Sequence, residues 1–205
     1  MDTNFDFPFN EELGTLALTG ENFRINSYPQ LAYDPVLNRL VVVWNDDRNG
    51  QYDATGASVK TNGDNIVSTS TDGVHWSRPK VLGTPQDEVF GAAATLAGFV
   101  AVSSYTRHYD PAGIKLDYAY WTSFSPRNIR TSPIRRITTQ SSDPQIQFVA
   151  VNAAGEEIQG VFIGDYTAMA VGADQRLHPC WTDFRGRPGV TAPNQDSYTQ
   201  TVSLS

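Results

Sequence analysis

The sequence predicts an all-β fold, and three observations carry that prediction. Short runs rich in Val, Thr, Tyr and Trp lie between clusters of Gly, Asn, Asp and Pro, which is the pattern of strands separated by tight turns. A gapless internal repeat divides the chain into similar units. No segment keeps a helical period over several turns. The alanine-rich residues 90–96 are few and include Gly91, so we interpret them as a strand of small residues that packs closely on its neighbours.

The repeat has the form R-L-x-x-x-W-x-D-x-R and occurs at residues 39–48 and again at residues 176–185. A strand-like run and a turn precede each copy. A degraded copy lies between the two and ends at Arg107. Small antiparallel sheets that repeat along a chain in this way are typical of the blades of a β-propeller.

Three blades are predicted from these repeats. Their strands are expected at residues 29–33, 39–45, 65–70 and 76–82, at 89–96, 99–104, 116–122 and 134–139, and at 160–171, 176–182 and 196–203. The third blade lacks a fourth strand, which residues 13–18 of the N-terminal segment 1–22 could supply. Propellers have about four to eight blades. We therefore expect residues 1–205 to be a single domain, or a fragment of one, that forms a partial ring of about three to four blades.

Composition narrows the class of protein. The chain is 40% hydrophobic and 18% charged, which argues against a disordered chain or a coiled coil. Its net charge of −7 argues against a nucleic-acid binder.

No apolar run approaches the ~18 residues of a membrane span. The first residues do not resemble a signal peptide, so we expect a protein that stays inside the cell or a piece of a longer one. Cys180 is the only cysteine, so no internal disulfide and no cysteine-based zinc site can form.

Residues 70–76 read S-T-D-G-V-H-W, and this motif belongs to a tight turn between two strands. Aspartate can accept hydrogen bonds from nearby backbone amides, and glycine supplies a positive φ. The motif resembles the Asp-box, or BNR repeat, of sialidases and related propellers, one residue shorter than its commonest form. That resemblance implies a structural role for Asp72 in the turn between blade strands three and four. We expect Trp76 to pack this turn onto the sheet.

Further motifs follow the order found in the sialidase family. Phe23-Arg24-Ile25-Asn26 is similar to the family's F/Y-R-I-P motif, with asparagine in place of proline. A strand pair, Arg48, Asp53 and the Asp-box follow in turn, and Tyr166 opens a strand of the third blade. The resemblance spans roughly residues 23–183. It implies a glycoside hydrolase that releases terminal sialic acids, and a secreted or cell-surface location.

The same resemblance assigns roles to single residues. Asp53 would be the general acid/base and Tyr166 the covalent nucleophile. Arg24 and Arg48 would bind the sugar carboxylate, and Arg107 and Arg185 are further candidates for substrate binding. Arginine forks suit carboxylates, and a tyrosine nucleophile avoids the repulsion that a carboxylate nucleophile would meet. We expect a sialylated glycan or another acidic carbohydrate as partner, with no cofactor and no metal.

Blade topology supplies an independent reason to group these residues. Loops between strands two and three lie at the same end of a blade as the residues that open strand one. All six candidates are expected in such positions, so one face of the propeller would carry them and the opposite face would carry the Asp-box. Polar residues around one mouth are what a binding site requires.

Each role has a structural alternative. Arg48 and Arg185 could pair with Asp46 and Asp183 at the ends of repeated blades, and Arg24 could form a surface ion pair. Asp53 could cap its own loop, and Tyr166 could pack against its strand. The alternative functions are a non-catalytic Asp-box propeller that binds glycan or protein, and a structural module of a larger secreted protein.

Overall fold

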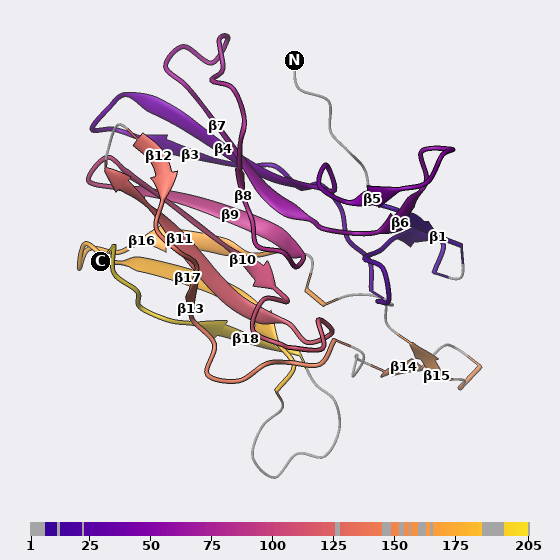
Figure 1. Ribbon diagram of the computed structural model, residues 1–205. Helices are drawn as coiled ribbons and strands as arrows, with labels where there is room; N and C mark the ends of the chain where they lie inside the picture. Colours follow the sequence, from indigo (N-terminus) through magenta and orange to yellow (C-terminus); the bar gives the residue numbers. More distant parts are fainter. Residues whose placement is uncertain are drawn as a thin grey trace.

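The computed structural model of the protein describes residues 7–11, 13–21, 23–125, 128–144, 149–151, 154–155, 157–159, 163–164, 166–185 and 195–204. Every regular element within these ranges is a β-strand (Figure 1). The strands form three main antiparallel sheets and three small hairpins. The predicted all-β fold is confirmed, and the architecture is that of a partial propeller. No helix long and apolar enough to cross a membrane occurs in the part of the chain that the structure describes.

The first sheet has the strand order β3-β4-β7-β8. Its strands alternate between two faces, as the apolar pattern predicts. Val41, Val43 and Val67 are buried on one face, where they pack with Ala93 and Val102 of the next sheet. Leu31 and Tyr33 point to the other face and are largely exposed. The strands are β3 (Gln30–Asp34), β4 (Arg39–Asp46), β7 (Asp64–Ser70) and β8 (Lys80–Leu82).

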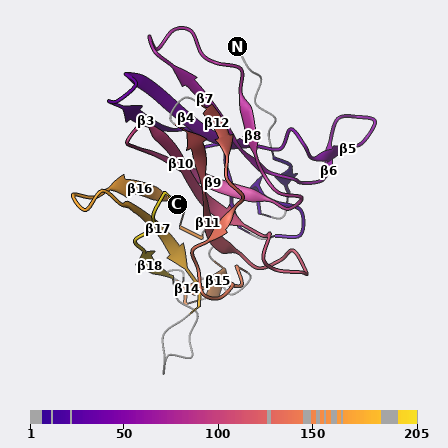
Figure 2. The ribbon, with the colours of Figure 1, turned by 60° about the vertical axis from the view of Figure 1, so that its left-hand side comes forward.

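The second sheet lies between the other two (Figure 2). Its first strand, β9, contacts β3 and β4 on one side and β16 on the other. The small side chains of Ala92, Ala93 and Ala94 permit this close approach, and all three are buried, which confirms the small-residue strand. The strands are β9 (Glu88–Leu96), β10 (Phe99–Thr106) and β11 (Asp117–Ser125), with β12 (Asn128–Thr131) and β13 (Arg135–Arg136) both paired to β11.

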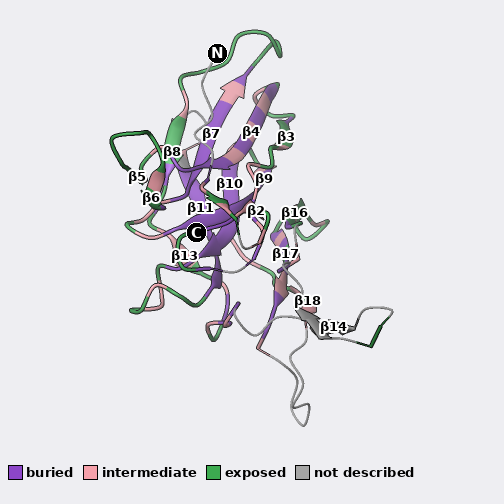
Figure 3. Cartoon of the chain, turned by 90° about the vertical axis from the view of Figure 1, so that its right-hand side faces the viewer, coloured by how far each residue is buried: buried purple, intermediate pink, exposed green. Residues whose placement is uncertain are grey.

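The third sheet has the order β16-β17-β18. An aromatic cluster joins it to the second sheet, and the rings of Tyr118 and Trp181 stack with centroids 5.0 Å apart. Burial is concentrated in β4, β7, β9, β10 and β11, whereas β8 and most turns are exposed (Figure 3). The strands are β16 (Ala168–Val171), β17 (Leu177–Asp183) and β18 (Asp196–Thr199). Part of the predicted strand 160–171 lies outside the described residues.

The N-terminal segment does not add a strand to the third sheet where it is described. The stretch that could have closed that blade instead forms β2 (Thr15–Leu16), which pairs with β1 (Phe9–Asn10). Leu18 explains this placement, because it is buried in the core cluster of the second and third sheets. The other hairpins are β5 (Gln51–Tyr52) with β6 (Ser58–Lys60) and β14 (Val149–Val151) with β15 (Glu157–Gln159).

Candidate functional site

One end of the sheets gathers the residues that open β3, β9 and β16 together with the loops that leave β4, β10 and β17. We call this end the mouth; it comprises residues 24–29, 47–63, 84–87, 107–116, 166–167 and 184–185. Antiparallel pairing places all of these segments at the same end of their sheets. The sequence-predicted candidates therefore share one end of the fold, as expected, but their side chains differ in what they contact.

Hydrogen bonds tie together the openings of the three sheets. The Gln30 side-chain amide donates to the Thr167 carbonyl (2.9 Å), and the Thr167 hydroxyl donates to the Phe90 carbonyl (2.6 Å). Phe90 has a φ of +55°, and the register of β9 against β10 shifts beside it, between Ser103 and Tyr105. A bulky residue seldom adopts a positive φ. Such strain and such bulges gather at functional sites, so the mouth is a strong candidate for one.

Two tyrosines stand exposed beside these openings. Tyr166, which precedes β16, is 70% exposed, and Tyr28, which precedes β3, is 38% exposed. Their rings meet edge to face with centroids 5.6 Å apart. Tyr166 therefore does not match the alternative of a tyrosine packed within its strand. Arg24 lies half-buried in the segment that leads to Tyr28.

Arg48 and Arg185 each form a bidentate ion pair within their own repeat. The Arg48 guanidinium donates to both carboxylate oxygens of Asp46 at 2.8 and 2.6 Å, and Arg185 does the same to Asp183 at the same distances. The repeat's tryptophan donates to the same carboxylate, from Trp44 at 3.1 Å in the first sheet and from Trp181 at 3.3 Å in the third. The W-x-D-x-R motif thus forms the same closed corner twice, which matches the architectural alternative.

Electrostatics around Asp183 fit that corner. Burial disfavours the charged carboxylate, but the hydrogen bonds from Arg185 and Ser142 outweigh burial and hold the pKa of Asp183 below its usual value. The Arg185 guanidinium also lies over the Tyr198 ring, 4.7 Å from its centroid. The Asp183 carboxylate and the Arg185 guanidinium therefore bind each other within this corner.

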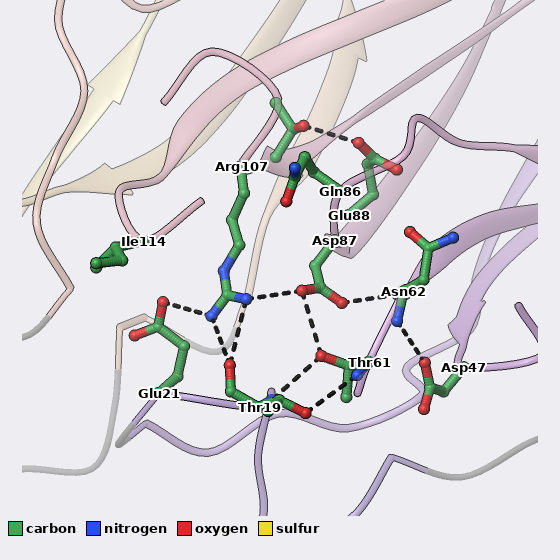
Figure 4. A network of polar contacts seen from close by, with 12 residues as sticks. Thr19, Glu21, Asp47, Thr61, Asn62, Gln86, Asp87, Glu88, Arg107 and Ile114 are labelled. Carbon is green, nitrogen blue, oxygen red and sulfur yellow. Dashed lines mark hydrogen bonds and ion pairs between the residues drawn. The ribbon is translucent and has the colours of Figure 1, made fainter. Parts of the chain in front are cut away.

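Arg107 is buried and joins two segments of the mouth to the N-terminal segment (Figure 4). One terminal nitrogen binds Glu21 at 2.5 Å, and the other binds Asp87 at 2.7 Å. Asp87 in turn accepts hydrogen bonds from the Thr61 hydroxyl and the Gly63 amide. Only 6% of the Arg107 side chain is exposed, so this arginine holds the mouth together from within.

Asp53 lies on the exposed turn of the β5–β6 hairpin, where it caps its own loop. Its carboxylate accepts hydrogen bonds from the Thr55 hydroxyl and from the Thr55 and Ala57 amides. These bonds, the Thr55 hydroxyl first, lower the pKa of Asp53. A general acid requires a raised pKa, so this geometry matches the loop-capping alternative. The acid/base role of Asp53 stays a prediction.

Sequence reasoning did not single out a set of buried carboxylates behind the mouth. Burial raises the pKa of Asp64 to about 7 and that of Glu88 to about 8, and burial also raises the pKa of Asp47. Asn49 donates to Asp64, and Thr84 and Thr106 donate to Glu88. One feature of the sequence could have revealed two of these carboxylates. Asp64 and Glu88 are the first residues of β7 and β9, where an acidic residue interrupts the apolar pattern of a buried strand.

The turn at residues 70–76 lies at the end of the first sheet opposite the mouth, between β7 and β8, as predicted. Asp72 accepts hydrogen bonds from the Val74 and His75 amides, and Gly73 has a φ of +73°. Trp76, which we expected to pack this turn onto the sheet, donates its indole N–H to the Gly73 carbonyl of the turn and is 42% exposed, so its ring is only partly covered. Trp76 faces an open groove that Trp44 also lines, and within the described residues no sheet packs on this face of β4 and β7.

Comparison with known proteins defines a fold class only. No family model and no curated protein matches the chain. Among solved structures it is similar to a protein of unknown function from Dyadobacter fermentans DSM 18053, with a TM-score of 0.51, 13% identity, and coverage of 97% of this chain and 54% of that one. An N-acetylgalactosamine deacetylase from F. plautii, solved with blood group B trisaccharide, gives a TM-score of 0.48, 11% identity, and coverage of 85% and 48%.

A third similar structure is the Trypanosoma rangeli sialidase in complex with sialic acid, with a TM-score of 0.41, 12% identity, and coverage of 97% of this chain and 31% of that one. The chain spans about half the length of the first two solved proteins. Its likeness to propeller glycoside hydrolases lies at the level of the fold. The class that the fold defines is thus an all-β partial propeller.

Proposed function

We propose that this protein is a glycan-binding β-propeller module that binds a sugar at its mouth. The observation that carries the proposal is the exposed Tyr28–Tyr166 pair beside the joined openings of the three sheets. A tyrosine ring offers an apolar face to the C–H groups of a sugar and a hydroxyl to its polar groups. Each tyrosine lies two residues before a strand, Tyr28 before β3 and Tyr166 before β16, so the fold holds the pair in place.

The paired arginines favour binding over hydrolysis of sialosides. Arg48, Arg107 and Arg185 each bind carboxylates of this chain. To bind the carboxylate of a sugar, these arginines would first have to break their internal ion pairs, which are partly or wholly buried. Asp53 is ionised by the bonds of its own loop rather than kept protonated for a leaving group. The mouth can therefore present aromatic rings to a sugar more readily than it can assemble an acid/base pair.

Sialic acid release is the second candidate function. Two observations favour it: Tyr166 is exposed two residues before β16 begins, and Arg24 lies in the segment that leads into β3. A tyrosine nucleophile needs a nearby carboxylate to take its proton. Asp165, its neighbour in sequence, lies outside the described residues.

Titration of sialyllactose and lactose by NMR, together with a fluorogenic sialoside assay, distinguishes the two functions. We expect binding without turnover, and loss of binding in both Tyr28→Ala and Tyr166→Ala. Tyr33→Ala is the matched control, because Tyr33 is 55% exposed and lies at the far end of β3. Binding that survives both mouth substitutions would contradict the proposal. Turnover that Tyr166→Phe abolishes would establish the sialidase function instead.

A further inference from the structure

A second groove lies outside the mouth, between the edge of the second sheet and the last described residues. Its volume is about 400 Å³, and its lining includes Tyr120, Arg135, Arg136, Arg176, Gln200 and Thr201. Pairing within the fold builds it: Arg135 of β13 lies opposite Tyr120 of β11, and Leu177 of β17 bridges to Val202. Figure 1 shows β13 near β17, with the C-terminal segment running back along β17.

The groove holds two arginines, Arg135 and Arg176, that form no direct ion pair with a carboxylate of the described residues. Arg135 lies over the Tyr120 ring, 5.7 Å from its centroid, and its nearest hydrogen-bond acceptors are the Tyr120 hydroxyl and the Leu204 carbonyl at 3.4 and 3.5 Å. Arg176 is exposed. Neither guanidinium forms an ion pair within the described part of the chain. These cations stand out in a protein with a net charge of −7.

Neighbouring charges offset the positive charge of the groove only in part. Arg136 binds the buried Asp117 at 2.8 Å, so it adds little charge of its own. Asp174 is the acid closest to Arg176 in sequence, and its carboxylate accepts hydrogen bonds from the Arg176 amide and from His178 at 3.0 Å. The hydrogen bond from His178 and, more weakly, the charge of Arg176 lower the pKa of Asp174. The carboxylate forms no direct ion pair with the Arg176 guanidinium within the described residues, and that guanidinium stays exposed.

We propose that this groove is an anion-binding site for an acidic glycan, in which Arg135 and Arg176 bind a carboxylate or sulfate group carried by a sugar. Planar guanidinium forks match both anions. Gln200 and Thr201 add an amide and a hydroxyl to the lining, which suits a hydrated saccharide better than an apolar peptide. The site is separate from the mouth and does not depend on what the mouth binds.

Calorimetric titration tests this site with a sulfated oligosaccharide, a uronic-acid oligosaccharide, a neutral oligosaccharide of matched length, and inorganic sulfate. We expect at least one acidic oligosaccharide to bind and the neutral one to fail. Arg135→Gln and Arg176→Gln should each weaken binding about tenfold, the usual effect of losing one charge-assisted hydrogen bond. The two acidic oligosaccharides identify which anion the groove prefers, and free sulfate shows whether the sugar contributes to affinity.

Three controls keep the proposal open to contradiction. Arg78→Gln removes an exposed arginine of the first sheet and should leave the affinity unchanged. Tyr166→Ala should also leave this affinity unchanged. The proposal for the groove and the proposal for the mouth can therefore be contradicted independently. Equal binding of the neutral oligosaccharide, or equal weakening by Arg78→Gln, would overturn the proposal. Arg176→Gln changes an exposed side chain, and its thermal melting should match that of the parent.

Discussion

The last arginine of the repeat is used in two different ways in this molecule. In the first and third sheets, Arg48 and Arg185 bind the aspartate two residues earlier, and their side chains are 17% and 16% exposed. In the second sheet, Arg107 is buried and binds Glu21 and Asp87, which come from distant parts of the chain. The outer copies therefore close their own sheet, whereas the middle copy joins the mouth to the N-terminal segment.

Sequence explains the difference. The middle copy has Tyr105 where the others have aspartate, so Arg107 has no local carboxylate and reaches across to other segments. The second sheet also lies between the other two, which leaves this arginine without access to water. A repeated motif thus indicates architecture where it is intact, and its degraded copy marks the place where the sheets are joined.

The largest effect should come from Arg107→Ala. Glu21 and Asp87 would stay buried without their cation, and breaking a buried ion pair costs about 3–5 kcal/mol. Urea unfolding monitored by tryptophan fluorescence measures this loss. Arg48→Ala is the matched control, and we expect it to cost clearly less. Equal losses in the free energy of unfolding for the two variants would contradict the distinction between the middle copy of the repeat and the outer copies.

Stability should fall as the pH rises from about 4 to about 8. The folded-state pKa values of Asp64 and Glu88 are raised by burial to about 7 and about 8, so in this range the folded state holds protons that the unfolded state has released. Unfolding then releases protons, and the free energy of unfolding falls with pH. Urea titrations at about pH 5 and pH 8 measure the slope. Asp64→Asn should flatten it, and an unchanged slope in that variant would contradict the role of Asp64.

The two outer corners should differ slightly in strength. Asp46→Ala and Asp183→Ala each remove the acceptor of an arginine fork and of a tryptophan, and charge-assisted hydrogen bonds contribute about 1.5–3 kcal/mol. Trp181 is buried and Trp44 is half-buried, so the indole left without an acceptor costs more in the third sheet. Thermal denaturation should rank Asp183→Ala as the less stable variant. The reverse order would show that burial does not set the strength of the corner.

Trp76→Ala should have the smallest effect. Because the ring is 42% exposed, truncation should cost about 1 kcal/mol rather than the several kcal/mol of a buried tryptophan. Chemical denaturation measures the difference. A loss above about 3 kcal/mol would mean that Trp76 is covered in solution by another part of the protein or by a partner.

The main strands of the three sheets and their order were predictable, because period-two alternation and Gly/Asp turns report local structure. The short strands β5, β6, β12, β14 and β15 were not predicted. The repeat also offered, as the alternative to substrate binding, the equivalent corners that Arg48 and Arg185 form. What the sequence could not show was which carboxylates Arg107 binds, since Arg107 and Glu21 are brought together only by the packing of the sheets. The exposure of Trp76 depends on what covers the first sheet, and the strain at Phe90 depends on its register against β10. Neither is a local property of the sequence.

The most direct test of a mouth that binds through its aromatic pair is a comparison of sialyllactose affinities for Arg48→Ala, Arg185→Ala and Tyr166→Ala, measured by NMR titration. Because both arginines are held in their own corners, we expect the two arginine variants to bind like the parent and Tyr166→Ala to lose binding. Loss of binding in either arginine variant, with Tyr166→Ala unaffected, would show that the arginines bind the ligand and that the corners are not purely architectural.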